Sequence, residues 1–211
     1  MVIKNSKVKC KNCQLEVNIT EVSCSAGRFG IKTDLRAGGF AVKTPPVIKC
    51  KRCFYIFCDK RLTINEKLLD VYIKSGEYKN LLRYEEKKYL VIYNIYKNIR
   101  LSLEMQNKIL LYNYYDTKKT DDLKLLADGY KLFLQEHTQE DKDFLFANMM
   151  IGEYYRRVGE FEKAKDIFTK LLDLDISIDF DVVEKCKFQL ELIEKKYQRV
   201  YKFPKYDSRQ I

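Results

Sequence analysis

Two Cys-x-x-Cys pairs, 40 residues apart, restrict what the first part of this chain can fold into. They read Cys10-Lys11-Asn12-Cys13 and Cys50-Lys51-Arg52-Cys53. Each spacing places two thiols on one tight turn, so that both sulfurs can reach a single tetrahedral ion at about 2.3 Å and leave two ligand positions for the other pair. The four cysteines Cys10, Cys13, Cys50 and Cys53 therefore predict one structural Zn²⁺ site.

Three other interpretations of the cysteines stay open. A redox dithiol requires a βαβ pattern around a Cys-x-x-Cys pair, and neither pair has one. An iron–sulfur site uses the same kind of ligand. In the third interpretation, Cys24 or Cys58 joins or replaces a ligand, although a buried reduced thiol is the ordinary state of such residues. The seventh cysteine, Cys186, lies on an apolar helical stripe, where we expect it to pack in a core.

Charge and cysteine content both change near residue 61. Residues 1–61 contain 13 Lys+Arg, 4 Asp+Glu and six of the seven cysteines, whereas residues 62–211 contain 27 Lys+Arg and 26 Asp+Glu. We predict a zinc-ribbon-like metal-binding domain over 1–61, a helical domain over 62–200 and a flexible tail over 201–211. A domain of about 60 residues seldom folds by burial alone, and structural zinc can contribute on the order of 10 kcal/mol of folding free energy.

The hydrophobic period also changes at this boundary. Residues 15–22 alternate apolar and polar side chains, which is typical of a half-buried strand, and short strands are expected at 40–42, 47–48 and 54–57. Beyond residue 61 the period is helical. Thr63 and Glu66 form a capping-box pattern that begins a helix ending near Gly76. Further helices are predicted over 79–100, 102–115, 120–136, 141–158, 161–174 and 180–198. The predicted fold class is α+β, with a small β zinc ribbon followed by an all-α array of helical hairpins.

One segment of the helical part resembles a tetratricopeptide repeat. From Ile151 it reads IGEYYRRVGEFEKAKDIFTKLLDLD. The small residues Gly152 and Ala164 are expected to let two antiparallel helices approach closely, while Tyr155 and Phe168 fill the space beside them. No second clear copy is visible, and repeat arrays usually need about three copies for stability. The sequence therefore predicts one such hairpin within a helical array.

The tetratricopeptide resemblance implies a partner-binding surface. In such repeats the first helix commonly lines a concave groove that receives a partner peptide. By this resemblance, the residues facing a protein partner are Phe146, Met149, Glu153, Arg156 and Arg157. The two arginines also suit the last turn of a helix without any ligand, because the helix dipole favours cations there.

The order of motifs along the chain resembles an uncharacterised bacterial family, catalogued as domain of unknown function 2225. The resemblance rests on the two cysteine pairs, the apolar stretch after Pro46 that leads into CKRCFY, and IGEYYRRVGEFEKAKDIF followed by QLELIEKK. Zinc ribbons often carry Gly after the second cysteine of a turn, and here Gln14 and Phe54 stand at those positions. The family has no established reaction, so the resemblance implies architecture rather than chemistry.

Several function classes lack their sequence signals. His137 is the one histidine and lies in a polar connector, and no Gly-rich phosphate loop, nucleophile elbow or HExxH motif is present. No apolar run reaches the roughly 18 residues of a membrane span, and the beginning of the sequence shows no signal-peptide pattern. We therefore predict a cytoplasmic protein that is not an enzyme, and that acts as a zinc-binding adaptor or scaffold for protein–protein interaction.

The basic first segment favours a second hypothesis, a zinc ribbon that binds nucleic acid. Its net charge of +9 could be used for phosphate contacts, which gain affinity by counterion release. The aromatic residues Phe29, Phe40 and Tyr55 could stack on bases. The cations also have a simpler role, because four thiolates and one Zn²⁺ carry a formal charge of −2. The cations that flank the thiolates are Lys9, Lys11, Lys49, Lys51 and Arg52.

Overall fold

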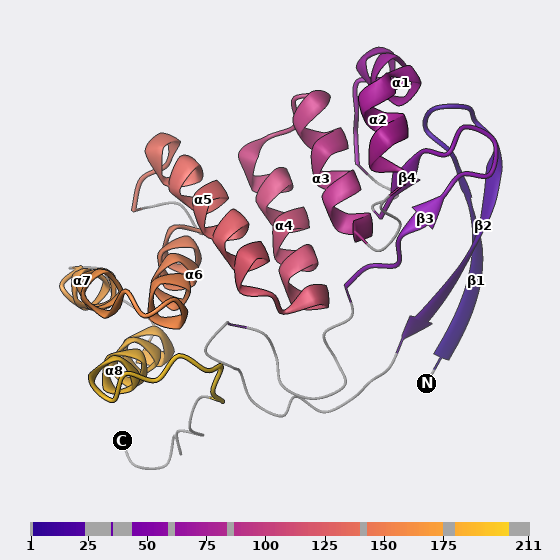
Figure 1. Cartoon of the computed structure of the whole chain (residues 1–211). Coiled ribbons are helices and arrows are strands. Elements are labelled where there is room, and N and C mark those ends of the chain that lie inside the picture. Colours follow the sequence, from indigo (N-terminus) through magenta and orange to yellow (C-terminus); the bar gives the residue numbers. More distant parts are fainter. Residues whose placement is uncertain are drawn as a thin grey trace. The chain divides into compact units, whose positions relative to one another are not determined.

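The computed structural model describes residues 2–23, 35, 44–58, 62–83, 87–139, 143–174 and 180–202. The chain divides into two compact units, unit 1 with residues 1–25 and 43–118, and unit 2 with residues 26–42 and 119–211. Short strands and the cysteine pairs come first and helices follow (Figure 1), so the predicted α+β class is confirmed. The compositional change at residue 61 lies inside unit 1.

The described part of unit 1 begins with two antiparallel strand pairs. Strand β1 (Val2–Lys9) pairs with β2 (Glu16–Ser23) in a register that joins Lys9 to Glu16, and β3 (Ile48–Lys49) pairs with β4 (Ile56–Phe57). The alternation over 15–22 is confirmed as β2, and the strand expected at 40–42 lies outside the described residues. Each pair of strands is connected through a Cys-x-x-Cys turn, so both turns occupy the same kind of position.

Among its described residues, unit 1 is completed by four helices: α1 (Glu66–Lys74), α2 (Gly76–Leu81), α3 (Lys88–Asn98) and α4 (Leu103–Thr117). Helix α1 begins after Asn65, whose side-chain oxygen accepts from Leu68 N–H at 3.2 Å, so the capping box predicted at Thr63 is wrong. Ser75 interrupts the helical run, and its hydroxyl caps α2 by accepting from Tyr78 N–H at 3.1 Å. The single helix predicted over 79–100 is in fact two helices.

The cysteine turns and these helices share one hydrophobic core. Cys10 and Cys50 are fully buried, and the same cluster extends through Leu69 of α1 and Ile92 of α3 to Ile109 of α4. The hydroxyl of Tyr78 donates to Phe54 O of the second turn at 2.7 Å. Helix α3 lies beside α4 (Figure 1) and closes the core. Unit 1 is therefore a ribbon built onto a helical layer.

Unit 2 contains α5 (Thr120–Glu136), α6 (Phe144–Arg157), α7 (Phe161–Leu172) and α8 (Phe180–Glu194). Consecutive helices pack against each other, with α6 between α5 and α7 and with α7 against α8. The core includes Ala164, Phe168 and Cys186, and Leu35 from the connection between the two cysteine pairs packs against it. Tyr201 and Lys202 of the predicted tail are described, and residues 203–211 lie outside the described part.

Gly152 sets the distance between α6 and α7. A Cβ atom at Gly152 would lie 2.6 Å from Cζ of Phe168 and 2.8 Å from its Cε2, and Phe168 is fully buried. The close approach predicted for the two helices is thus present between α6 and α7. The assignment of this hairpin to the tetratricopeptide class stays a prediction.

We expect Gly152→Ala to destabilise unit 2 by about 1–2 kcal/mol. Overpacking of a filled core costs about 1–3 kcal/mol, and the better helix propensity of alanine returns up to about 1 kcal/mol. Urea unfolding followed by circular dichroism measures the difference. Gly76→Ala is the matched control, because nothing lies within 4 Å of a Cβ atom there. Equal stability of the Gly152→Ala variant and the unmodified chain would contradict the tight contact.

Candidate metal centre

The two Cys-x-x-Cys turns have the same local structure. Cys10 N–H donates to Leu15 O at 2.9 Å, and Gln14 N–H donates to Cys10 O at 2.8 Å. At the same offsets in the second turn, Cys50 N–H donates to Tyr55 O at 2.9 Å and Phe54 N–H donates to Cys50 O at 3.0 Å. Each turn thus fixes its backbone around the first cysteine, and the two cysteine side chains project together.

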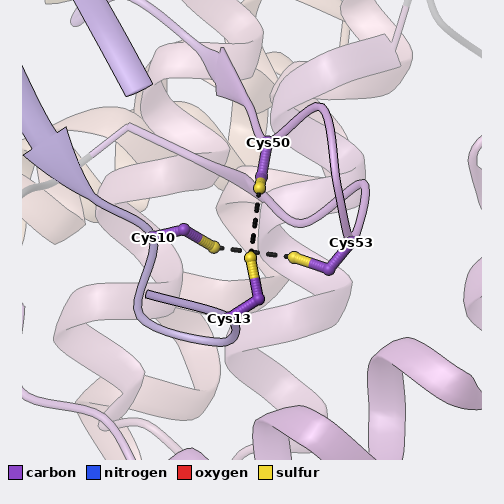
Figure 2. A group of neighbouring side chains, drawn as sticks. All are labelled: Cys10, Cys13, Cys50 and Cys53. Carbon is purple, nitrogen blue, oxygen red and sulfur yellow. Dashed lines mark hydrogen bonds between the residues drawn. The ribbon is translucent and has the colours of Figure 1, made fainter. Parts of the chain in front are cut away.

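The four sulfur atoms meet between the turns (Figure 2). Cys10 Sγ lies 3.5 Å from Cys53 Sγ, and Cys13 Sγ lies 3.5 Å from Cys50 Sγ. All four atoms lie within 4.8 Å of one another. Four bonds of about 2.3 Å to a tetrahedral ion place sulfurs about 3.8 Å apart, which is close to these distances. Among the described residues, no other Cys, His, Asp or Glu side chains form such a group.

The other cysteines do not enter this group where they are described. Cys58 follows β4 and is buried in the core of unit 1, outside the cluster of four sulfurs. Cys186 is 1% exposed and packs in the core of unit 2. Cys24 lies outside the described residues, so its proposed participation stays open.

The electrostatics of the cluster favour a bound cation. Burial raises the pKa of Cys10 and of Cys53. Burial acts the same way on Cys50, but the backbone N–H groups of Cys53 and Arg52, together with the thiols of Cys13 and Cys53, outweigh it and lower the pKa of Cys50 to about 7. Four adjacent thiols cannot all ionise without a compensating charge, whereas a divalent ion replaces their protons. A tetrahedral four-sulfur donor set suits zinc or an iron–sulfur centre.

The cations near the turns divide into two groups. Lys11 Nζ donates to Leu62 O, and Lys49 Nζ lies 5.9 Å from the centre of the Phe54 ring, so both contact unit 1 itself. Lys9, Lys51 and Arg52 are exposed at the surface, and so is Lys49. Positive charge is therefore adjacent in sequence to both cysteine pairs, and most of it faces solvent.

Gln14 and Phe54 occupy the positions, one in each turn, at which zinc ribbons often have glycine. Their φ angles are +59° and +60°, in the left-handed region. That region costs a residue with a Cβ atom about 1–2 kcal/mol. The departure from the glycine pattern therefore leaves the turn geometry in place and stores strain in each turn.

We expect Gln14→Gly to raise the free energy of unfolding of unit 1 by up to about 1 kcal/mol, because glycine adopts positive φ without the steric cost. Gln14 is exposed, so little packing is lost. Gln14→Ala is the matched control, since it removes the same side chain but keeps the strain. Denaturant unfolding in the presence of zinc compares the two variants. If they are equally stable, backbone strain is not the cause.

The five residues predicted to face a partner lie in different surroundings within unit 2. Met149 is 3% exposed, and Glu153 and Arg156 are fully buried. Phe146 and Arg157 are half-buried, and the Phe146 ring lies 5.9 Å from that of Tyr130. Three of the five therefore face the interior of the unit.

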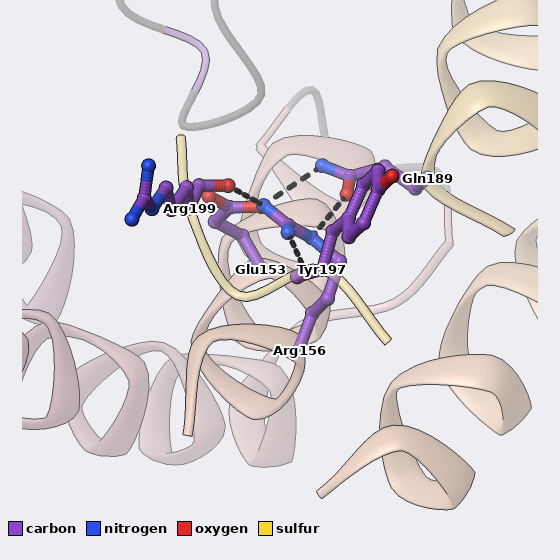
Figure 3. A network of polar contacts seen from close by, with 5 residues as sticks. All are labelled: Glu153, Arg156, Gln189, Tyr197 and Arg199. Carbon is purple, nitrogen blue, oxygen red and sulfur yellow. Dashed lines mark hydrogen bonds and ion pairs between the residues drawn. The ribbon is translucent and has the colours of Figure 1, made fainter. Parts of the chain in front are cut away.

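Glu153 and Arg156 belong to a polar network that the sequence pattern does not reveal (Figure 3). Arg156 Nη2 donates to Glu153 Oε2 at 2.7 Å, and Arg156 Nε donates to Gln189 Oε1 at 2.9 Å. Arg156 also donates to two main-chain carbonyl oxygens, those of Tyr197 and Arg199, the latter at 2.9 Å. Gln189 and the two carbonyl groups lie more than 30 residues from Arg156, so no local sequence signal identifies them.

Comparisons with known proteins add no information to these assignments. No protein-family model, curated protein or solved structure matches this chain. Within the described part of the chain, none of the helices has the length and apolar content needed to cross a membrane.

Proposed function

We propose that this protein is a non-catalytic, zinc-binding adaptor of the cytoplasm. The observation that carries the proposal is the convergence of four sulfurs from two turns to within 4.8 Å. A four-cysteine set fills every ligand position of a tetrahedral ion, which is typical of structural zinc, whereas catalytic zinc keeps an open position. Zinc is favoured over an iron–sulfur cluster because the turns resemble ribbon turns and a single ion accounts for all four sulfurs.

The proposed role of the metal is to join the two strand pairs of unit 1. Each sulfur–sulfur contact at 3.5 Å links one turn to the other, because Cys10 faces Cys53 and Cys13 faces Cys50. The sulfurs adjoin the core that continues into α1, α3 and α4. Metal binding would thus stabilise the helices of unit 1 as well as its strands. The helical hairpins of unit 2 are the proposed protein-binding part.

Metal analysis of protein purified without added zinc tests the first half of this proposal. We expect about one equivalent of zinc for each chain. Less than half an equivalent of any metal would reject the metal centre, and iron with visible charge-transfer absorption would replace zinc by an iron–sulfur centre. Cys58→Ala serves as the control, because Cys58 is described and does not belong to the group of four sulfurs, so this variant should keep its metal.

Affinity purification from the native cell, with nuclease treatment, tests the adaptor half. A protein partner that is retained after nuclease supports it. Recovery of nucleic acid with no protein partner rejects it.

The second candidate function is nucleic-acid binding by unit 1. It is favoured by the exposed cations Lys9, Lys51 and Arg52 near the sulfur cluster, together with Phe54, whose side chain is 52% exposed. Exposed aromatic rings beside cations are the usual platform for single-stranded nucleic acid. Titration of DNA and RNA at several salt concentrations separates the candidates, since phosphate binding must weaken as salt rises. An affinity that does not change with salt would exclude this function.

A further inference from the structure

Arg156 is covered by a segment that follows the last helix. Its side chain is fully buried, which is rare for arginine unless all of its donors are paired. Two of its partners are the carbonyl oxygens of Tyr197 and Arg199. We call residues 197–202 the strap. The two carbonyl groups belong to alternate residues and both accept from the same guanidinium, so the strap presents its main chain to Arg156.

The site under the strap is electrically balanced. The Arg156 guanidinium is paired with the Glu153 carboxylate at 2.7 Å, and Gln189 Nε2 donates to the same carboxylate oxygen at 3.1 Å. Since the positive charge is already compensated, the remaining donors of Arg156 suit neutral carbonyl groups better than a free carboxylate. Figure 3 shows the Arg199 side chain directed away from Arg156 while its carbonyl group faces it. The site thus recognises main chain rather than a charged side chain.

Local geometry directs the strap over this site. Helix α8 is followed by Lys196 at φ +54°, where Lys196 N–H donates to Ile193 O and Tyr197 N–H donates to Leu192 O, both at 2.9 Å. This pattern ends the helix with a residue in the left-handed region and turns the chain out of the helix axis. The strap then passes the turn between α6 and α7, because a Cβ atom at Gly159 would lie 2.6 Å from Nε2 of Gln198.

Three consecutive side chains of the strap, at residues 197–199, face solvent, whereas Val200 and Tyr201 are half-buried. Gln198 and Arg199 are exposed, and Tyr197 is 45% exposed while its ring stacks on that of Tyr201 at 5.6 Å. A segment with exposed side chains and main-chain anchoring can leave without opening the core of unit 2. Its departure would leave the Arg156 donors without their two carbonyl partners.

We propose that Glu153, Arg156 and Gln189 form a site for the main chain of a peptide segment, and that the strap occupies this site as an internal ligand that a partner protein displaces. The inference rests on the adaptor function proposed above, and it identifies the recognised element as a peptide segment bound through its main-chain carbonyl groups. The strap supplies the template, since a displacing segment must offer two carbonyl groups at alternate residues.

The effective concentration of the strap determines how strongly it competes with a free peptide for the site. A segment tethered to its site by a short linker has an effective concentration in the millimolar range. If the same peptide binds the open site with a Kd of about 0.1 mM, the tethered strap weakens the binding of a free peptide about tenfold.

The test uses a labelled peptide with the sequence of residues 195–202, KKYQRVYK, and the full chain. The strap is weakened by Tyr197→Gly, Gln198→Gly and Tyr201→Gly together, which removes the ring stack and the contact at Gly159. The glycines also raise the entropic cost of fixing the main chain that pairs with Arg156. We expect the weakened chain to bind the peptide about tenfold more tightly than the unmodified chain in fluorescence anisotropy. Adding Glu153→Leu and Arg156→Met to the weakened chain removes the site and should abolish this binding.

Equal affinity of the weakened and unmodified chains would overturn the proposal, as would binding that survives loss of the site. Hydrogen exchange of the full chain gives a second measurement that needs no strap variant. The amides of the strap should exchange at least tenfold faster than those of the middle of α6, and comparable protection would make the strap a fixed part of the core. A dimer formed by exchange of straps, detected by light scattering, would make a second copy the occupant instead of a partner.

These outcomes are independent of the test of the adaptor function. The peptide probe comes from the chain itself, so its failure to bind leaves the metal and partner experiments unaffected. Absence of a partner in affinity purification would reject the adaptor while leaving the strap measurement valid.

Discussion

Cys50→Ser should abolish metal binding and unfold unit 1. The serine hydroxyl does not replace a thiolate ligand, and the three remaining sulfurs leave the cluster open. Structural zinc contributes on the order of 10 kcal/mol, which is comparable with the whole stability of an ordinary domain, about 5–15 kcal/mol. Because Cys50 is fully buried in the core that contains Leu69 and Ile92, the loss should reach α1 and α3. Amide spectra in NMR and the metal content measure both effects.

A matched control separates metal loss from ordinary core damage. Cys58→Ala changes a buried cysteine of the same core that is not among the four clustered sulfurs. It should keep one equivalent of metal and lose only about 1–2 kcal/mol, as single substitutions commonly do. A strong chelator should reproduce the effect of Cys50→Ser in the unmodified chain. A Cys50→Ser chain that keeps the signals of α1 and α3 without metal would show that the centre is not structural.

Arg156→Met should destabilise unit 2 by about 3–5 kcal/mol. Removing one partner of a buried ion pair leaves the other charge without compensation in a low-dielectric interior. Here Glu153 would lose the Arg156 guanidinium and keep Gln189 Nε2 at 3.1 Å, and the carbonyls of Tyr197 and Arg199 would lose the same guanidinium. Urea unfolding monitored by circular dichroism gives the free energy.

The double variant Glu153→Leu with Arg156→Met tests the cause of this loss. Replacement of a whole buried ion pair by apolar groups is often close to neutral, so the double variant should be more stable than Arg156→Met alone. A double-mutant cycle then yields the coupling between the two side chains. If the single variant costs less than about 1 kcal/mol, water reaches the pair and the site is not closed.

Local patterns in the sequence predicted the features that depend on local structure. The helical period over 120–136 gives α5 with the same ends, and the spacing within each cysteine pair predicts turns whose sulfurs converge. The substitution of Phe54 for glycine did not change the turn, because hydrogen bonds to Cys50 and from Tyr78 hold it. Backbone strain of about 1 kcal/mol is small beside the contribution of a metal.

Features that depend on distant contacts could not be predicted in this way. Tyr89 packs against the chain before the second cysteine pair. Its hydroxyl donates to Pro45 O at 2.7 Å, a contact between residues 44 positions apart. From the sequence alone, Arg156 is expected to be a surface cation in the last turn of a helix. In the structure it is buried, with hydrogen-bond partners 33 to 43 residues away. The sequence pattern also did not predict strand β1, because β1 has few apolar positions. It forms a strand by pairing with β2.

Unit 1 is made from two stretches of chain, 1–25 and 43–118, and this division has a consequence for synthesis on the ribosome. Cys13 precedes its neighbour Cys50 by 37 residues, so at about 5–20 residues per second the first thiol pair waits about 2–7 s for the second. The helices that complete its core follow later still. A nascent chain therefore carries an unfinished thiol pair during elongation, and we expect metal supply during translation to determine the yield of folded protein.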